Sequence, residues 1–165
     1  MSSLFHPIQR TTLRAASAAA ITGSTTLTHA DLGSASGAPV ISTRFKKAVI
    51  QVVSTDQNLP NGANQIDVYF QTTYDEGTNW VDIEAIQYLD ASAATGFNDN
   101  ETAKYIVTIQ DKMSAESSVN MTDAGLSSPG RNDLPLGDGL RVKVVFANTT
   151  GSPSITFGIE VLLYA

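Results

Sequence analysis

The sequence contains no cysteine, so neither a disulfide nor a thiolate metal site can form. Its two histidines, His6 and His29, match no metal-ligand or catalytic spacing. No apolar run approaches the ~20 residues needed to cross a bilayer, which predicts no membrane span. Charged residues make up only 16% of the chain, below the roughly one quarter of an average soluble domain. We therefore expect part of the polar surface to face other protein.

The charges that are present are unevenly distributed. Residues 1–47 carry a net charge of +4, whereas residues 48–165 carry −10. This asymmetry is typical of an interaction tail. The acidic part would repel phosphate, and the basic part lacks the clustered Lys and Arg of a nucleic-acid groove. We predict no nucleic-acid partner and expect the basic segment to lie on acidic protein surface.

The first part of the chain differs in composition from the rest. Residues 1–44 are rich in Ser, Thr, Ala and Gly and show no sustained hydrophobic period. They predict an extended N-terminal arm, with a candidate short strand at residues 25–28, followed by a globular domain over residues 45–165. Arg10 and Arg14 followed by residues 15–21 also resemble a secretory signal, but this apolar run is short and weakly hydrophobic.

Residues 65–90 carry the clearest structural pattern. Ile66, Val68 and Phe70 alternate with polar residues, an acidic turn containing glycine follows, and a second run begins at Trp80. Alternation of period two on both sides of a short turn predicts a half-buried β-hairpin.

Four more segments show β-strand patterns, at residues 45–53, 105–109, 140–146 and 155–164. The last two flank a short turn and predict a second hairpin. In the final segment Phe157 lies on one face, while Leu162 and Tyr164 make the other face apolar too, which indicates a central strand or a subunit contact. Together the segments predict an all-β antiparallel sandwich, with the jelly roll as a candidate topology. Residues 111–139 are expected to form a long, packed loop.

Candidate catalytic and metal-binding residues are isolated. Asp82 and Glu84 are expected on one strand face about 7 Å apart, a spacing that glycosidases use, but an acidic β-protein offers such pairs by chance. Residues 33–37 resemble a nucleophile elbow except that Ala35 replaces the serine. Residues 98–101 could offer oxygen ligands to Ca²⁺ without the spacing of an EF-hand. We predict no enzyme activity, no cofactor and no metal centre.

The turn of the central hairpin has the pattern Thr73-x-Asp75-x-Gly77-x-x-Trp80, which resembles the Asp-box of sialidases. Asp75 can accept hydrogen bonds from the turn backbone, Gly77 can adopt a positive φ, and Trp80 can fold over the base of the hairpin. The sequence has one copy of this motif, and the chain is too short for a propeller. We therefore predict a structural turn and no sialidase activity.

The same hairpin, residues 68–83, resembles a strand, turn and strand pattern found in small β-sandwiches of tailed-phage virion proteins. The most similar of these are head decoration or cement proteins. The resemblance implies a non-enzymatic protein of the virion, located on the capsid surface as a homotrimer, with the major capsid protein as its partner.

On this hypothesis the arm docks on neighbouring subunits through Phe5, Ile8, Arg10, Leu13 and Arg14, and the sandwich forms a subunit contact through Phe157, Leu162 and Tyr164. Two alternatives remain open. One is a glycan-binding module of a phage tail or fibre, with Trp80, Tyr69 or Tyr88 stacking on sugar rings. The other is a tail or head-completion structural protein.

Overall fold

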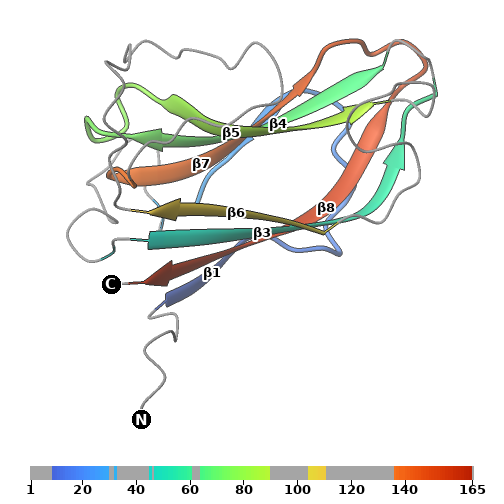
Figure 1. The fold of residues 1–165 in the computed structure, drawn as a ribbon. Coiled ribbons are helices and arrows are strands. Elements are labelled where there is room, and N and C mark those ends of the chain that lie inside the picture. The colour runs from blue at the N-terminus through green and yellow to red at the C-terminus, as the bar shows by residue number, and fades with distance from the viewer. Residues whose placement is uncertain are drawn as a thin grey trace.

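The computed structural model describes residues 9–29, 32, 45, 47–60, 64–89, 104–110 and 136–164. These residues form two four-stranded antiparallel sheets that pack face to face (Figure 1). The strands are β1 (Gln9–Arg14), β2 (Thr25–Leu27), β3 (Lys47–Asn58), β4 (Gln65–Thr73), β5 (Val81–Leu89), β6 (Lys104–Gln110), β7 (Gly139–Phe146) and β8 (Ser154–Tyr164). Within these ranges no helix is long and apolar enough to span a membrane.

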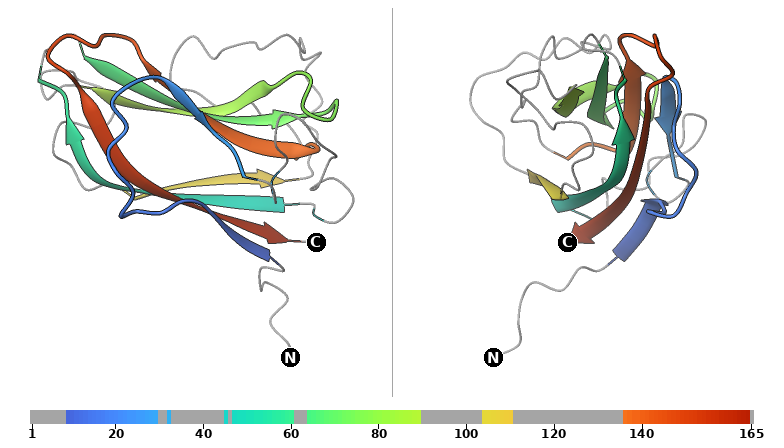
Figure 2. Two further views of the ribbon diagram at one scale, coloured as in Figure 1. Left: turned by 180° about the vertical axis from the view of Figure 1, so that it is seen from behind. Right: turned by 90° about the vertical axis from the view of Figure 1, so that its right-hand side faces the viewer.

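The strand order defines the topology. The first sheet runs β1-β8-β3-β6 and the second β2-β7-β4-β5, so β1 pairs with β8, β2 with β7, β3 with β6 and β4 with β5. Successive pairs alternate between the two sheets, which is the arrangement of an eight-stranded jelly roll. The predicted antiparallel sandwich is confirmed, and the jelly roll is its topology. Figure 2 shows residues 147–153 carrying the chain from β7 in one layer to β8 in the other.

The core lies between the inner faces of the sheets. Alternate residues of each strand point inward because the side-chain period of a strand is two. The buried residues include Ala48, Ile50 and Val52 of β3, Ile66, Val68 and Phe70 of β4, Val142 and Val144 of β7, and Ile155, Phe157, Ile159, Val161 and Leu163 of β8. The face of β8 that carries Phe157 is therefore turned toward the core.

The predicted arm differs from the structure over residues 9–29. Both β1 and β2 come from this segment and form edge strands, one in each sheet. Ile21 makes two backbone hydrogen bonds with Ile155, of 2.8 and 3.0 Å, and Leu32 is completely buried in the core. An arm separate from the sandwich is thus wrong for this segment, because short edge strands rich in threonine lack the apolar period of central strands. Residues 1–8 lie outside the described residues.

The predicted second hairpin is also wrong. Strand β7 lies between β2 and β4, whereas β8 lies in the other sheet between β1 and β3. Residues 147–153 cross from one sheet to the other, a gap of about 10 Å. The side-chain amide of Asn64 donates to the carbonyls of Asn148 and Thr150, at 3.0 and 3.1 Å, and ties this crossing to the start of β4.

Most of the predicted long loop, residues 111–139, lies outside the described residues. Its last part contacts the sandwich, where Leu136 packs against the core. The Gly137 amide donates to the Thr72 hydroxyl at 3.1 Å, and the Asp138 amide donates to the Thr73 carbonyl at 2.6 Å. This end of the segment is packed.

Candidate functional site

The β4–β5 turn is held by its own side chains. Asp75 accepts hydrogen bonds from the Asn79 amide at 2.8 Å, the Asn79 side chain at 2.7 Å and the Thr73 hydroxyl at 2.9 Å. The Gly77 amide donates to Thr73 Oγ1 at 3.0 Å, and Gly77 adopts a φ of 88°. Trp80 Nε1 donates to the Gly77 carbonyl at 3.0 Å. The Asp-box residues here therefore form and close a turn.

This turn is expected to weaken in acid. The Asn79 amide and side chain stabilise the Asp75 carboxylate and lower its pKa below the ordinary value. A carboxyl group with a lowered folded-state pKa stabilises the fold above its unfolded pKa and loses that contribution as the pH falls through the folded value. We expect Tm to fall on acidification below pH about 4, and Asp75→Asn to flatten that dependence. Melting curves across the acid range measure the effect, with Asp56→Asn on exposed β3 surface as the control. Equal acid sensitivity in Asp75→Asn and the parent would contradict it.

Trp80 is not an exposed platform for a sugar ring. Its side chain is only 3% exposed, and the Arg141 guanidinium lies 4.4 Å from the ring centroid. Arg141 Nε donates to Gln71 Oε1 at 2.6 Å, and Gln71 Nε2 donates to Asp82 Oδ1 at 2.5 Å. The glycan-binding alternative thus loses its main aromatic residue. The side chain of Tyr88 lies outside the described part of the structure.

Tyr69 belongs to a second polar group on the same outer face. The Lys143 ammonium lies 5.9 Å from its ring centroid, and its hydroxyl donates to Asp67 Oδ2 at 3.4 Å. Asp67 also accepts from Gln65 Nε2 at 2.8 and 2.9 Å. Burial, followed by the charges of Asp67 and Asp82, raises the pKa of Tyr69 to about 12. The protein stabilises this phenol in its neutral form.

Alkaline pH is therefore expected to destabilise the fold. A tyrosine with a raised folded-state pKa contributes stability that is complete below its unfolded pKa of about 10 and is lost as the pH rises toward the folded value. We expect the free energy of unfolding to fall between pH 10 and the Tyr69 pKa of about 12, and to fall less in Tyr69→Phe. Urea titrations at several alkaline pH values test this, with Tyr164→Phe as a control for removal of a hydroxyl on the other sheet. If the free energy of unfolding of Tyr69→Phe fell at alkaline pH as much as that of the parent, the role given to Tyr69 would be contradicted.

The carboxylates of Asp82 and Glu84 do not form the predicted pair on a regular strand face. Asp82 lies opposite Gln71 and Glu84 opposite Phe70, with a register shift between the two positions. This β-bulge interrupts the alternation on which the prediction relied. Across the described ranges, no group of three or more His, Cys, Asp or Glu side chains could hold a metal ion. Residues 98–101, the candidate Ca²⁺ ligands, lie outside those ranges.

The outer face of the first sheet has a different character. Strand register places residues of β3, β8 and β1 in three transverse rows, which are Lys47 and Tyr164, then Val49, Leu162 and Arg10, then Gln51, Glu160 and Thr12. We call these eight residues the β8 outer face. Leu162 is only 6% exposed, and the Lys47 ammonium lies 5.6 Å from the centroid of the Tyr164 ring. The face combines an apolar centre with charged residues around it.

The predicted contact residues divide between the two sides of this sheet. Leu162 and Tyr164 lie on the β8 outer face, whereas Phe157 is completely buried in the core. The Arg14 guanidinium lies 5.5 Å from the centroid of the Phe157 ring, and Leu13 packs against the core. Phe157, Leu13 and Arg14 therefore contact this chain's own interior.

Of the remaining predicted arm residues, only Arg10 lies in the described part of the chain. Its side chain is 61% exposed and lies 3.6 Å from the Glu160 carboxylate, which is 40% exposed. Phe5 and Ile8 belong to the undescribed segment that precedes β1. The structure thus brings Arg10, Leu162 and Tyr164 together on one face.

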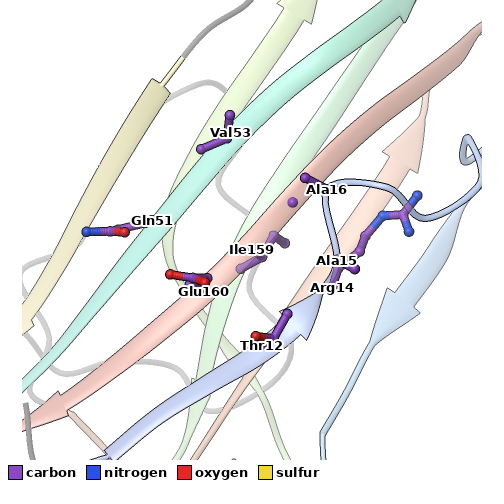
Figure 3. A pocket seen from close by; sticks show the side chains of 9 residues that line it. Thr12, Arg14, Ala15, Ala16, Gln51, Val53, Ile159 and Glu160 are labelled. Carbon is purple, nitrogen blue, oxygen red and sulfur yellow. The ribbon is translucent and has the colours of Figure 1, made fainter.

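The third row also lines a groove that the sequence patterns do not predict. It has a volume of about 370 Å³ and is lined by Thr12, Arg14, Ala15, Ala16, Gln51, Val53, Gly158, Ile159 and Glu160 (Figure 3). Its wall is a turn closed by the Ala18 amide and the Ala15 carbonyl at 3.0 Å. This turn crosses β8 at Gly158, where an added Cβ would lie 2.9 Å from Ala16. A glycine inside an alternating strand was the available signal, because it marks a close backbone approach.

No protein-family model, curated protein or solved structure gives a significant match to this chain. The strand pairing alone therefore defines its class, which is the all-β jelly-roll sandwich.

Proposed function

We propose that this protein is a non-enzymatic structural protein of a virion. It binds the assembled head of a tailed phage as a decoration or cement protein, sits on the capsid surface as a homotrimer, and has the major capsid protein as its partner. Two features support the proposal, namely the resemblance of the β4–β5 hairpin and a jelly-roll topology that viral capsid domains also use. Because one fold hosts many functions, the argument depends on a particular surface.

The observation that carries the proposal is the β8 outer face. A sheet face turned away from the core normally carries polar residues, yet Val49, Leu162 and Tyr164 form an apolar centre there. Arg10 and Glu160 stand beside this centre. An apolar centre with a charged rim is the composition of a protein interface. Leu162 and Tyr164 are thus the proposed contact residues, and Phe157 supports β8 from the core side.

The function would consist of association alone. A protein that binds only the assembled shell stabilises that state by mass action. In the sequence, Phe5 and Ile8 precede Arg10 of the β8 outer face by only a few residues. A second contact through these residues would add to the first through effective concentration.

Sedimentation with purified capsids that lack this protein tests the proposal. We expect the full chain to bind at saturation and Val49→Glu to weaken binding at least about tenfold, since a charge at the centre of an interface must be desolvated. The matched control is Val145→Glu, a half-buried valine of β7 on the other sheet, which should bind as the parent does. Sedimentation equilibrium should give a trimer. A monomer without capsid affinity, or equal binding by both variants, would overturn the proposal.

A further inference from the structure

We propose that the groove beside Glu160 binds the alkylammonium group of a lysine side chain on a partner protein. The groove's three acceptors form the third row of the β8 outer face. It rests on the proposed function only for the identity of the partner.

Three oxygen acceptors line one side of the groove. Register places Gln51 of β3 and Thr12 of β1 on either side of Glu160 of β8, and neighbouring strands lie about 4.8 Å apart. Figure 3 shows the three side chains in a row across the strands. They offer the Glu160 carboxylate, the Gln51 amide oxygen and the Thr12 hydroxyl oxygen. An alkylammonium group has three donors and no acceptor, so its hydrogen-bonding capacity matches this row.

The rest of the groove is apolar and suits a hydrocarbon stem. Val53 and Gly158 line it from the sheet, and Ala15 and Ala16 from the turn that crosses β8. Lysine commonly packs its four-carbon stem on apolar surface while its ammonium group stays among polar groups. A volume of about 370 Å³ lies at the lower end of the range for ligand pockets, which leaves room for one side chain.

The charges also favour a cation. Although Arg14 lines the groove, its guanidinium points away from Glu160 in Figure 3, lies over Phe157 and donates to the Ala19 carbonyl. Glu160 has one ion pair in the described residues, with Arg10 at 3.6 Å, and both side chains are substantially exposed. Exposed pairs of this kind contribute little, so an incoming ammonium can replace Arg10.

An NMR titration of the full-length protein at low salt tests the proposal. The probes are n-butylammonium and a capped single lysine, and butyrate serves as the anionic counterpart. We expect saturable shifts of the Ala16, Gly158 and Glu160 amides with both cations and none with butyrate. Glu160→Gln should weaken binding about two- to fivefold, because it replaces the charged acceptor of an exposed pair by a neutral one. Glu76→Gln, an equal charge change on the exposed β4–β5 turn, should bind as the parent does.

A second variant separates recognition from a structural effect. Arg10→Gln removes the internal cation that competes for Glu160, so it should strengthen cation binding about two- to fivefold. Weaker or unchanged binding in Arg10→Gln, unchanged binding in Glu160→Gln, or equal shifts with butyrate would overturn the proposal. Cation binding without any capsid affinity would refute the proposed function alone. Capsid affinity without cation binding would refute the groove assignment alone.

Discussion

Replacing Phe157 by alanine is expected to lower the free energy of unfolding by about 3–5 kcal/mol. The ring is completely buried on the inner face of β8, with the Arg14 guanidinium 5.5 Å from its centroid. Removing the ring leaves a cavity between the two sheets. Strand β8 is held in place by backbone pairing with β1 on one side and β3 on the other. The site can therefore collapse only partly, and both lost burial and the residual cavity destabilise the fold.

Denaturant unfolding at several protein concentrations measures this effect. A core role predicts the same loss at every concentration, whereas a role in subunit contact predicts a loss that depends on association. Phe157→Leu should recover much of the stability, since it refills most of the cavity. Leu162→Ala, on the opposite face of the same strand, provides the comparison with a residue proposed to lie in the subunit contact. A loss below about 1 kcal/mol in Phe157→Ala, together with a changed oligomer mass, would place Phe157 at an interface.

Deleting residues 1–28 is expected to abolish cooperative unfolding. The deletion removes β1 and β2, the edge strands that cover β8 and β7. It also removes Ile21, which is 9% exposed and makes two backbone hydrogen bonds to Ile155. The backbone groups of β8 that pair with β1 would become a free edge beside an opened core, which favours aggregation.

Circular dichroism melting and amide NMR spectra test the deletion. The full-length Arg10→Gln variant is the control, because it alters an exposed side chain of β1 and keeps the strand. A truncated chain that melts cooperatively near the parent's Tm would contradict the assignment of β1 and β2 to the sandwich. If the deletion unfolds the protein, capsid-binding tests of residues 1–44 must use point variants.

The sequence predicts the central strands well because burial on one face requires a period of two. Ile66, Val68 and Phe70 show that period clearly, and the structure buries all three. The same pattern cannot name a strand's neighbours. It placed β7 and β8 in a hairpin, whereas the Asn148–Pro153 turn carries the chain to the other sheet. Alternation specifies a face, and pairing depends on contacts distant in sequence.

The candidate site was predicted only in part for the same reason. Leu162 and Tyr164 follow from the apolar second face of one strand. The groove requires Thr12, Gln51 and Glu160 to meet, and these residues come from three strands that are adjacent only after the roll has closed. No local pattern contains that information.

The pairing of the first strand with the last also bears on synthesis. Strand β8 is eleven residues long and follows all the other described strands in the sequence. Both β1 and β3 pair with it. Until β8 leaves the ribosome, β1 has no strand to pair with and β3 can pair only with β6. The first sheet therefore stays incomplete in the nascent polypeptide. High sequence separation of contacts slows folding. A stalled or prematurely terminated product would therefore present exposed strand edges and be a substrate for chaperones or proteases.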